Sequence, residues 1–95
     1  MVIVMGGGRR GGQERACNAI ARLLHETGEA LTLRQIFERA TYKNGKLLRM
    51  ARAGPTTLAA LGQYIRHDRK QRFQRHLMGA KEPNTYSLKR GAELE

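Results

Sequence analysis

Apolar residues recur at three- and four-residue spacing over residues 13–27, as on one face of an amphipathic helix. The inward positions of this helix are predicted to be Ala16, Cys17, Ile20, Leu23, Leu24 and Thr27. Gly28 follows directly and suits the left-handed residue that ends many helices. Cys17 is therefore expected to be a small buried group in the core.

A second helix is predicted over residues 33–41, because apolar residues again fall on one face. Thr32 offers an N-cap for it, and Gln35 stands three positions later, as a capping box requires. Residues 29–31, between the two helices, fit a short strand with Leu31 packed inward. The inward positions of the second helix are Leu33, Ile36, Phe37 and Ala40.

A third helix is predicted to begin at Gly54-Pro55 and to run to about Asp68, with Gly54 or Thr56 as its cap. Before it, Asn44-Gly45 marks a turn, and residues 46–53 fit either a short helix or a basic loop anchored by leucines. The buried stripe of the third helix is Leu58, Leu61, Gly62 and Ile65. At 100° per residue, its outer face carries Thr56, Ala60, Gln63 and His67, with Thr57 and Tyr64 on one shoulder.

The C-terminal third of the chain predicts a β-hairpin. Residues 72–77 alternate polar side chains with Phe73 and Leu77, as a half-buried strand does. Residues 78–84 contain a glycine and a proline and predict a loop with Lys81 near its tip. Residues 85–88 form the returning strand, with Tyr86 and Leu88 on one face.

The two ends of the chain lie outside the predicted domain, which covers residues 13–90 of the 95. Residues 1–12 predict a flexible Gly/Arg-rich tail, because their glycine density disfavours regular structure. Gly6 to Gly11 fit the dinucleotide-binding pattern by letter, but no βαβ unit surrounds them, so a basic arm is the better interpretation. Residues 91–95 are a C-terminal tail, in which Leu94-Glu95 is interpreted as a cloning remnant.

This order of elements resembles a winged helix-turn-helix domain, over about residues 13–90. It is similar to the module shared by some chromatin proteins, restriction endonucleases and a bacterial RNA polymerase accessory subunit. The resemblance lies in Gly28-Glu29-Ala30-Leu31-Thr32-Leu33-Arg34-Gln35-Ile36, Gly54-Pro55-Thr56, Phe73 and Tyr86-Ser87-Leu88. It implies a mainly α, α+β fold of three helices with a C-terminal hairpin wing. It also implies a third helix in the DNA major groove and a wing on the neighbouring backbone. The segment 43–52 departs from the pattern, because it is longer than a tight helix-turn-helix turn needs.

Charge points to an anionic partner. The formal net charge is +10, and ten Lys or Arg residues but only one acid, Asp68, lie between Arg39 and Arg75. Residues 13–29 sum to −1, so the first helix is interpreted as a scaffold and the rest as a docking surface. Nucleic acid is the first candidate partner, an anionic membrane surface the second, and a basic protein without such a partner the third.

The predicted DNA-binding residues lie on the third helix and the hairpin. Gln63 can pair with an adenine edge, Thr57 or Ala60 can meet a thymine methyl, and Tyr64 and His67 can reach phosphates or bases. The alternative is an ordinary solvated helix face. The remaining predicted contacts are Thr56, Arg66, Arg69, Lys70, Arg72, Arg75 and Lys81, with additional phosphate contacts from Lys43, Lys46, Arg49 and Arg52. Some of these cations instead fit helix capping or an exposed loop.

Other chemistry has little support in the sequence. A single cysteine allows no internal disulfide, no metal or cofactor site is predicted, and the scattered acids do not predict an enzyme. No apolar run suggests a signal peptide or a membrane span, which predicts an intracellular protein of the cytoplasm, nucleoid or nucleus. The predicted function is that of a regulator or accessory factor that binds double-stranded DNA. The alternative is a winged helix that binds RNA or an acidic protein. Aromatic residues for base stacking are few, which favours duplex DNA.

Overall fold

The computed structural model describes residues 5–52, 54–92 and 94, with side chains from residue 12 onward. This part of the chain is an α+β fold of three α-helices and a three-stranded antiparallel sheet. A 3₁₀ turn at Leu48–Met50 lies between the second and third helices. The helices are α1 (Met5–Thr27), α2 (Leu33–Arg39) and α3 (Leu58–Arg66), and the strands are β1 (Leu31–Thr32), β2 (Phe73–His76) and β3 (Thr85–Leu88).

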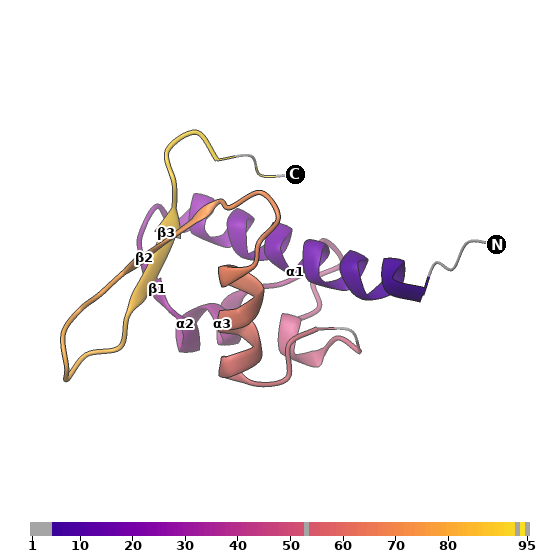
Figure 1. The fold of residues 1–95 in the computed structure, drawn as a ribbon, viewed down its shortest axis with the longest axis horizontal. Coiled ribbons are helices and arrows are strands. Elements are labelled where there is room, and N and C mark those ends of the chain that lie inside the picture. Colours follow the sequence, from indigo (N-terminus) through magenta and orange to yellow (C-terminus); the bar gives the residue numbers. More distant parts are fainter. Residues whose placement is uncertain (1–4, 53, 93, 95) are drawn as a thin grey trace.

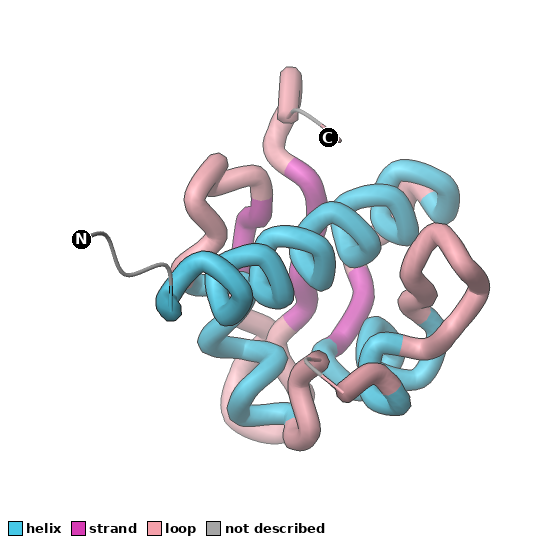
Figure 2. Tube along the Cα trace, turned by 90° about the vertical axis from the view of Figure 1, so that its right-hand side faces the viewer, coloured by secondary structure: helices cyan, strands magenta, loops and turns pink. Residues whose placement is uncertain are grey.

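The helices and the sheet enclose one core. The long helix α1 runs across the middle of the molecule in Figure 1, with α2 and α3 below it and the C-terminal segment above it. Figure 2 shows α1 crossing the three strands, among which β3 is central and pairs with β1 and β2. The hairpin loop between β2 and β3 extends away from α1 (Figure 1). The sheet order β1-β3-β2 therefore joins the short strand after α1 to the C-terminal hairpin.

The predicted apolar stripes meet in this core. Ile20 of α1, Ile36 of α2 and Leu61 of α3 are each fully buried. Of the other predicted inward positions, Leu23, Leu33 and Phe37 are half-buried and pack around the same cluster. The helical periodicity of the sequence thus identified the core faces of all three helices. The fully or nearly buried apolar residues are Ala16, Cys17, Ala19, Ile20, Ala21, Leu24, Leu31, Ile36, Ala40, Leu48, Leu61, Ile65 and Phe73.

The predicted helix ends around β1 are confirmed. Gly28 has a φ of +67°, and its N–H donates to the carbonyl of Leu24 at 3.0 Å. Thr32 and Gln35 form the complete capping box: the Gln35 N–H donates to Thr32 Oγ1, and the Thr32 N–H donates to Gln35 Oε1. These two signals fix the tight path of the chain between α1 and α2.

The β-hairpin is also confirmed, although its first strand spans residues 73–76 and not 72–77. Phe73 pairs with Leu88 and His76 with Thr85, in an antiparallel register that the sequence did not specify. The prediction that Leu77 packs inward is wrong, because β2 ends at His76 and Leu77 is 73 % exposed. Its place in the alternation matches that of Phe73, but it lies beyond the last paired residue, where nothing packs above it.

The N-terminal end of α1 differs from the prediction. Residues 1–4 lie outside the described residues, but the helix already begins at Met5 and includes the glycines at positions 6–8, 11 and 12. Each glycine is less favourable than alanine in a helix interior by about 1 kcal/mol, so this extension of α1 runs against the local preference of the sequence.

Residues 41–52 form a small ordered loop, which includes most of the segment 46–53 that fitted two alternatives. Thr41 and Leu47 pair as an antiparallel bridge around the turn at Asn44-Gly45, and the 3₁₀ turn follows. Leu48 is fully buried, which confirms the prediction that a leucine anchors this segment in the core. Gly54 packs against this loop so closely that an added Cβ would overlap the carbonyl oxygen of Leu48.

Among the described residues, none of the helices combines the length and the apolar character that crossing a bilayer requires.

Candidate nucleic-acid interface

A basic groove lies between α3 and the sheet. It has a volume of about 730 Å³, and none of the described residues that line it is acidic. Its apolar floor includes Leu58 of α3 and Phe73 of β2. Two glutamines and three cations surround this floor, and they come from α3, from the turn before β2, from β2 and from the residue that follows β3: Gln63, Arg66, Gln71, Arg75 and Lys89.

The predicted outer face of α3 is partly correct. Gln63 and Arg66 are exposed and line the groove, as their helical positions imply. The helix begins at Leu58, so Thr56 and Thr57 precede it, and Thr57 is the N-cap in place of Gly54 or Thr56. Thr57 Oγ1 accepts a hydrogen bond from the Ala60 N–H at 3.0 Å. Thr57, which was predicted to meet a thymine methyl, therefore has a structural role through its hydroxyl.

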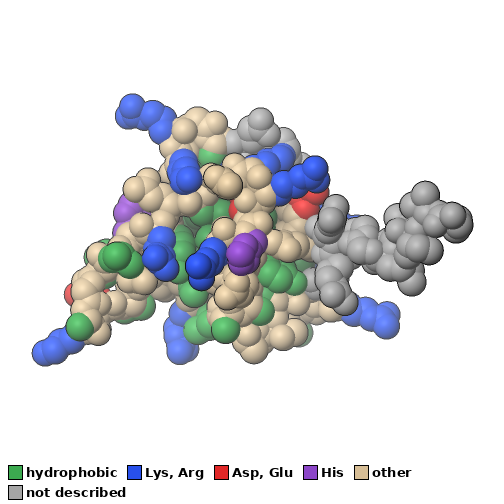
Figure 3. All heavy atoms as spheres, viewed as in Figure 1, with side chains coloured by type: hydrophobic (Ala, Val, Ile, Leu, Met, Phe, Trp, Pro, Cys, Tyr) green, Lys and Arg blue, Asp and Glu red, His purple; other side chains and the backbone are tan. Residues whose placement is uncertain are grey.

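The face of the molecule seen in Figure 3 carries several Lys and Arg side chains, and only small acidic areas are visible on it. Arg75 on β2 and Lys81 in the hairpin loop are exposed, as predicted. Arg49, on the 3₁₀ turn, is also exposed. These cations belong to different elements, so tertiary packing spreads the basic surface from α3 to the end of the hairpin.

Arg72 was predicted to contact phosphate, and this prediction is wrong. Its side chain is 1 % exposed and forms a bidentate pair with Asp68, with Nη2 2.9 Å from Oδ1 and Nε 3.0 Å from Oδ2. Nη1 donates to Asn18 Oδ1 of α1 and to the carbonyl of Leu94. The guanidinium also lies 5.6 Å from the ring centroid of Phe73. Arg72 thus joins α1, the turn after α3 and the C-terminal segment.

Contacts with Arg72 also decide the charge state of Asp68. Burial alone would raise the pKa of this carboxyl, but the hydrogen bonds and the positive charge of Arg72 outweigh it, and the pKa lies below its usual value. The turn that brings the two residues together contains Gln71, whose φ of 48° is in the left-handed region. Every buried polar side-chain atom in the described part of the chain has a hydrogen-bond partner.

Three other predicted contacts lie in the turn after α3. His67, Arg69 and Lys70 line a small hollow of about 280 Å³ between this turn and α1. Glu14 and Asp68 line the same hollow, so its cations are accompanied by acids. The basic cluster that the sequence placed at the end of the third helix is therefore divided: Arg66 and Arg75 belong to the groove, and these three face α1.

Tyr64 and Ala60 do not line the groove. Tyr64 is half-buried against the core, and its carbonyl accepts a hydrogen bond from the thiol of Cys17 on α1. Cys17 is buried as predicted, and this burial, followed by the charge of Asp68, raises the pKa of the thiol to about 12. Ala60 is partly buried. This shoulder of α3 therefore packs against α1 and serves the fold.

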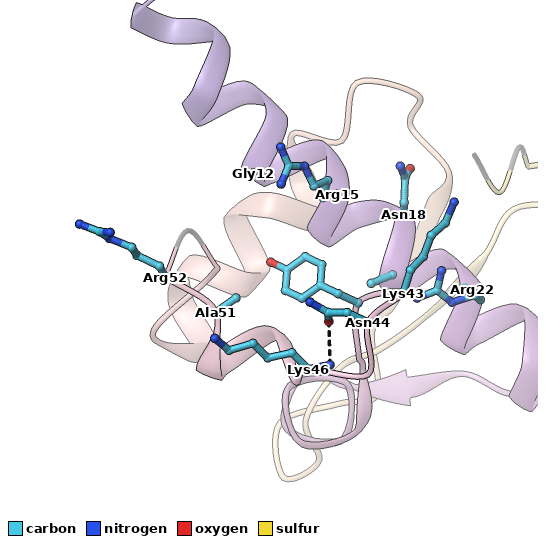
Figure 4. A pocket seen from close by; sticks show the side chains of 11 residues that line it. Gly12, Arg15, Asn18, Arg22, Lys43, Asn44, Lys46, Ala51 and Arg52 are labelled. Carbon is cyan, nitrogen blue, oxygen red and sulfur yellow. Dashed lines mark hydrogen bonds between the residues drawn. The ribbon is translucent and has the colours of Figure 1, made fainter.

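A second basic pocket lies between α1 and the loop of residues 41–52 (Figure 4). Its volume is about 650 Å³, and it brings together three predicted cations, Lys43, Lys46 and Arg52, with two that the sequence did not single out, Arg15 and Arg22. None of the described lining residues is acidic. Burial is the main cause that raises the pKa of Tyr42, which also lines this pocket.

The sequence contains a pattern that could have identified the lining residues of the second pocket on α1. Arg15, Asn18 and Arg22 recur at helical spacing on α1, and all three line the second pocket. Because the charges of this helix nearly cancel, the sum does not show that these residues lie on one face. Lys89 and Gln71 left no such signal, because they reach the groove only through the sheet pairing and the left-handed turn.

Among the described residues, no group of three or more His, Cys, Asp or Glu side chains is placed to hold a metal ion. Comparison with known proteins finds no matching family model, no matching curated protein and no matching solved structure.

Proposed function

We propose that this chain is a winged-helix domain that binds double-stranded DNA. The exposed face of α3 enters the major groove, and the hairpin of β2 and β3 lies on the neighbouring phosphate backbone. One observation carries the proposal: α3 and both strands of the hairpin contribute polar and cationic side chains to a single groove whose described lining contains no acid. A duplex presents base edges beside phosphates, and this groove offers amides beside cations.

Each group has a distinct role in this complex. Gln63 is exposed near the middle of α3, where its amide can form two hydrogen bonds with an adenine edge. Arg66, the last residue of α3, and Arg75, on β2, neutralise phosphates on either side of it. Lys89 adds a third cation from the residue that follows β3.

The experiment is a titration of duplex DNA with the full chain, followed by fluorescence anisotropy over a range of salt concentrations. The logarithm of the association constant should fall with the logarithm of salt by about 0.9 for each phosphate contact. The double variant R66A/R75A should therefore flatten the slope by about 2 and weaken binding to all DNA sequences alike. The matched control is R34A/R39A, which removes two exposed cations from α2 and should change the slope much less.

Gln63→Ala tests sequence readout separately from phosphate contact. It should leave the salt slope unchanged and reduce discrimination at one base pair by about 1–3 kcal/mol. The proposal fails if the wild-type chain binds no duplex at low salt, or if the two double variants weaken binding equally. Binding of structured RNA or of an acidic protein, with no binding of duplex DNA, would replace the proposal with the alternative function.

A further inference from the structure

Two exposed apolar side chains, Leu77 and Met78, stand together where the hairpin loop begins. Leu77 is 73 % exposed and Met78 is 45 % exposed, and they directly follow the last residue of β2. The other large apolar side chain that is exposed among the described residues is Met50, on the 3₁₀ turn. This apolar pair lies outside the core, so its apolar area is available to a partner.

The hairpin holds the apolar pair on an ordered arm. His76 pairs with Thr85 at the end of the two strands, and His76 Nε2 lies 2.7 Å from Ser87 Oγ. Within the loop, the Met78 N–H donates to Asn84 Oδ1 at 3.4 Å. Figure 1 shows that this loop extends well beyond the helices. The pair therefore stands away from the body of the protein, on a segment whose two sides are joined to each other.

The apolar pair continues the surface that lines the groove between α3 and the sheet. Phe73 and Arg75 of β2 both line this groove, as alternate residues on one face of a strand can do. Leu77 occupies the next position in this alternation, one residue beyond the end of β2. A partner that lies in the groove and follows the hairpin outward therefore reaches the apolar pair.

The charge of the hairpin favours a polyanion as this partner. The exposed charged residues of segment 73–90 are one acid, Glu82, and four cations, Arg75, Lys81, Lys89 and Arg90. In Figure 3 the arm at the lower left carries hydrophobic side chains, and a Lys or Arg side chain lies at its outer end. Proteins that combine apolar side chains with cations in this way insert the apolar groups between base pairs of the minor groove, while the cations neutralise phosphates.

From these observations we infer that the hairpin inserts Leu77 and Met78 as a wedge between two base pairs of the minor groove and thereby bends the duplex. The inference rests on the proposed function, in which the strands of the hairpin lie on the phosphate backbone beside α3. The minor groove lies directly beyond that backbone, where the exposed pair can reach it. Such a wedge bends DNA toward its major groove, which is the groove that α3 occupies in the proposed complex.

The test measures the bend by resonance energy transfer between dyes at the two ends of a short duplex, with the full chain at saturating concentration. The wild-type chain should bend the duplex by about 20–90°, the range for wedge-inserting proteins. L77S/M78S should abolish most of the bend, because serine has no apolar group large enough to separate two base pairs. The salt slope of this variant should match that of the wild type, since no cation is removed.

Two control variants and a pair of duplexes sharpen this test. M50S replaces the exposed apolar side chain on the 3₁₀ turn and should leave the bend unchanged, and L77I/M78I should retain it, because isoleucine also forms wedges. The wild-type chain should bind a duplex of alternating T and A about fivefold or more tightly than an A-tract, because TA steps unstack easily and A-tracts are stiff. L77S/M78S should lose most of this preference.

Two results would overturn the inference and leave the proposed function intact: a bound duplex that stays straight, or an equal bend with the wild-type chain and with L77S/M78S. The second result, combined with a loss of self-association in sedimentation, would assign the apolar pair to a contact with a second copy of the chain. Combined with a loss of binding to anionic phospholipid vesicles, it would assign the pair to a membrane surface. If the wild-type chain binds no duplex at all, the proposed function fails together with this inference.

Discussion

Arg72 and Arg75 stand three residues apart in the most basic part of the chain, and the fold uses them in opposite ways. Arg72 is 1 % exposed and makes hydrogen bonds to Asp68, Asn18 and the carbonyl of Leu94. Arg75 is exposed on β2 and lines a groove with no acid among its described residues. One arginine is a structural bridge between three segments, and the other is available to an anionic partner.

The difference teaches what makes a cation structural. A buried guanidinium is tolerated only when a carboxylate and further acceptors replace its water. The segment from Arg39 to Arg75 contains ten cations and one acid, Asp68, which stands four residues before Arg72. In this segment, the single acid therefore pairs with the one cation that has a structural role. Arg66 and Arg75, in contrast, are exposed and line the groove between α3 and the sheet.

The sharpest way to break this comparison is to remove the two arginines separately. Arg72→Met should destabilise the domain by about 3–5 kcal/mol, because it leaves the Asp68 carboxylate buried without its partner. Arg75→Met should change the free energy of unfolding by no more than about 0.5 kcal/mol, since its side chain is exposed. Urea denaturation of both variants measures the two values. Similar losses for both would show that the burial of Arg72 has no energetic importance.

Acid should weaken the buried bridge, whereas the exposed Lys and Arg side chains remain charged. The pKa of Asp68 is lowered in the folded protein, so its contribution to stability is present above the unfolded pKa of about 3.9. This contribution is lost as the pH falls through the folded-state value. Thermal unfolding between about pH 6 and pH 2 measures the loss, and D68N/R72M is the control that lacks the titrating group. Parallel curves for the two proteins would show that Asp68 does not titrate in this way.

Thr57 tests the same distinction for a hydroxyl. Its Oγ1 caps α3 through the Ala60 N–H, so Thr57→Ala should destabilise the domain by about 1 kcal/mol. Thr56→Ala should stay within about 0.5 kcal/mol, because Thr56 is exposed and precedes the cap. Chemical denaturation of the two variants side by side decides between them. A larger loss at Thr56 would mean that the helix begins earlier than Leu58.

The smallest effect on stability is expected at Gln71, in the turn directly before Arg72. Gln71 has a φ of 48°, a conformation that glycine adopts without the steric cost of a Cβ. Gln71→Gly should therefore stabilise the domain slightly, by up to about 1 kcal/mol, whereas Gln71→Ala should have little effect on stability. Differential scanning calorimetry of the three proteins can resolve this order. A destabilised glycine variant would indicate that the Gln71 side chain contributes more to the fold than its backbone costs.

Much of the fold could be predicted from residues close together in the sequence. The stripes that contain Ile20, Ile36 and Leu61 gave the three helices and their buried faces, because helical periodicity is a local property. The capping box at Thr32 and the two strands of the hairpin were predicted for the same reason. The glycine-rich start of α1 was not predicted, because its local propensity is against a helix.

The candidate sites depend on contacts that no local pattern contains. By itself, the sequence determined that the chain is basic, that its helices have one apolar face each, and that Gln63 lies on the outer face of the third helix. Only the tertiary structure decided that Arg72 is buried with Asp68, and that Lys89 and Gln71 join the groove. It also placed Arg15 and Arg22 of α1 in the lining of the same pocket as Lys43. Helical periodicity depends on residues close together in the sequence, whereas the partner of a charged side chain depends on packing between residues that are far apart in it.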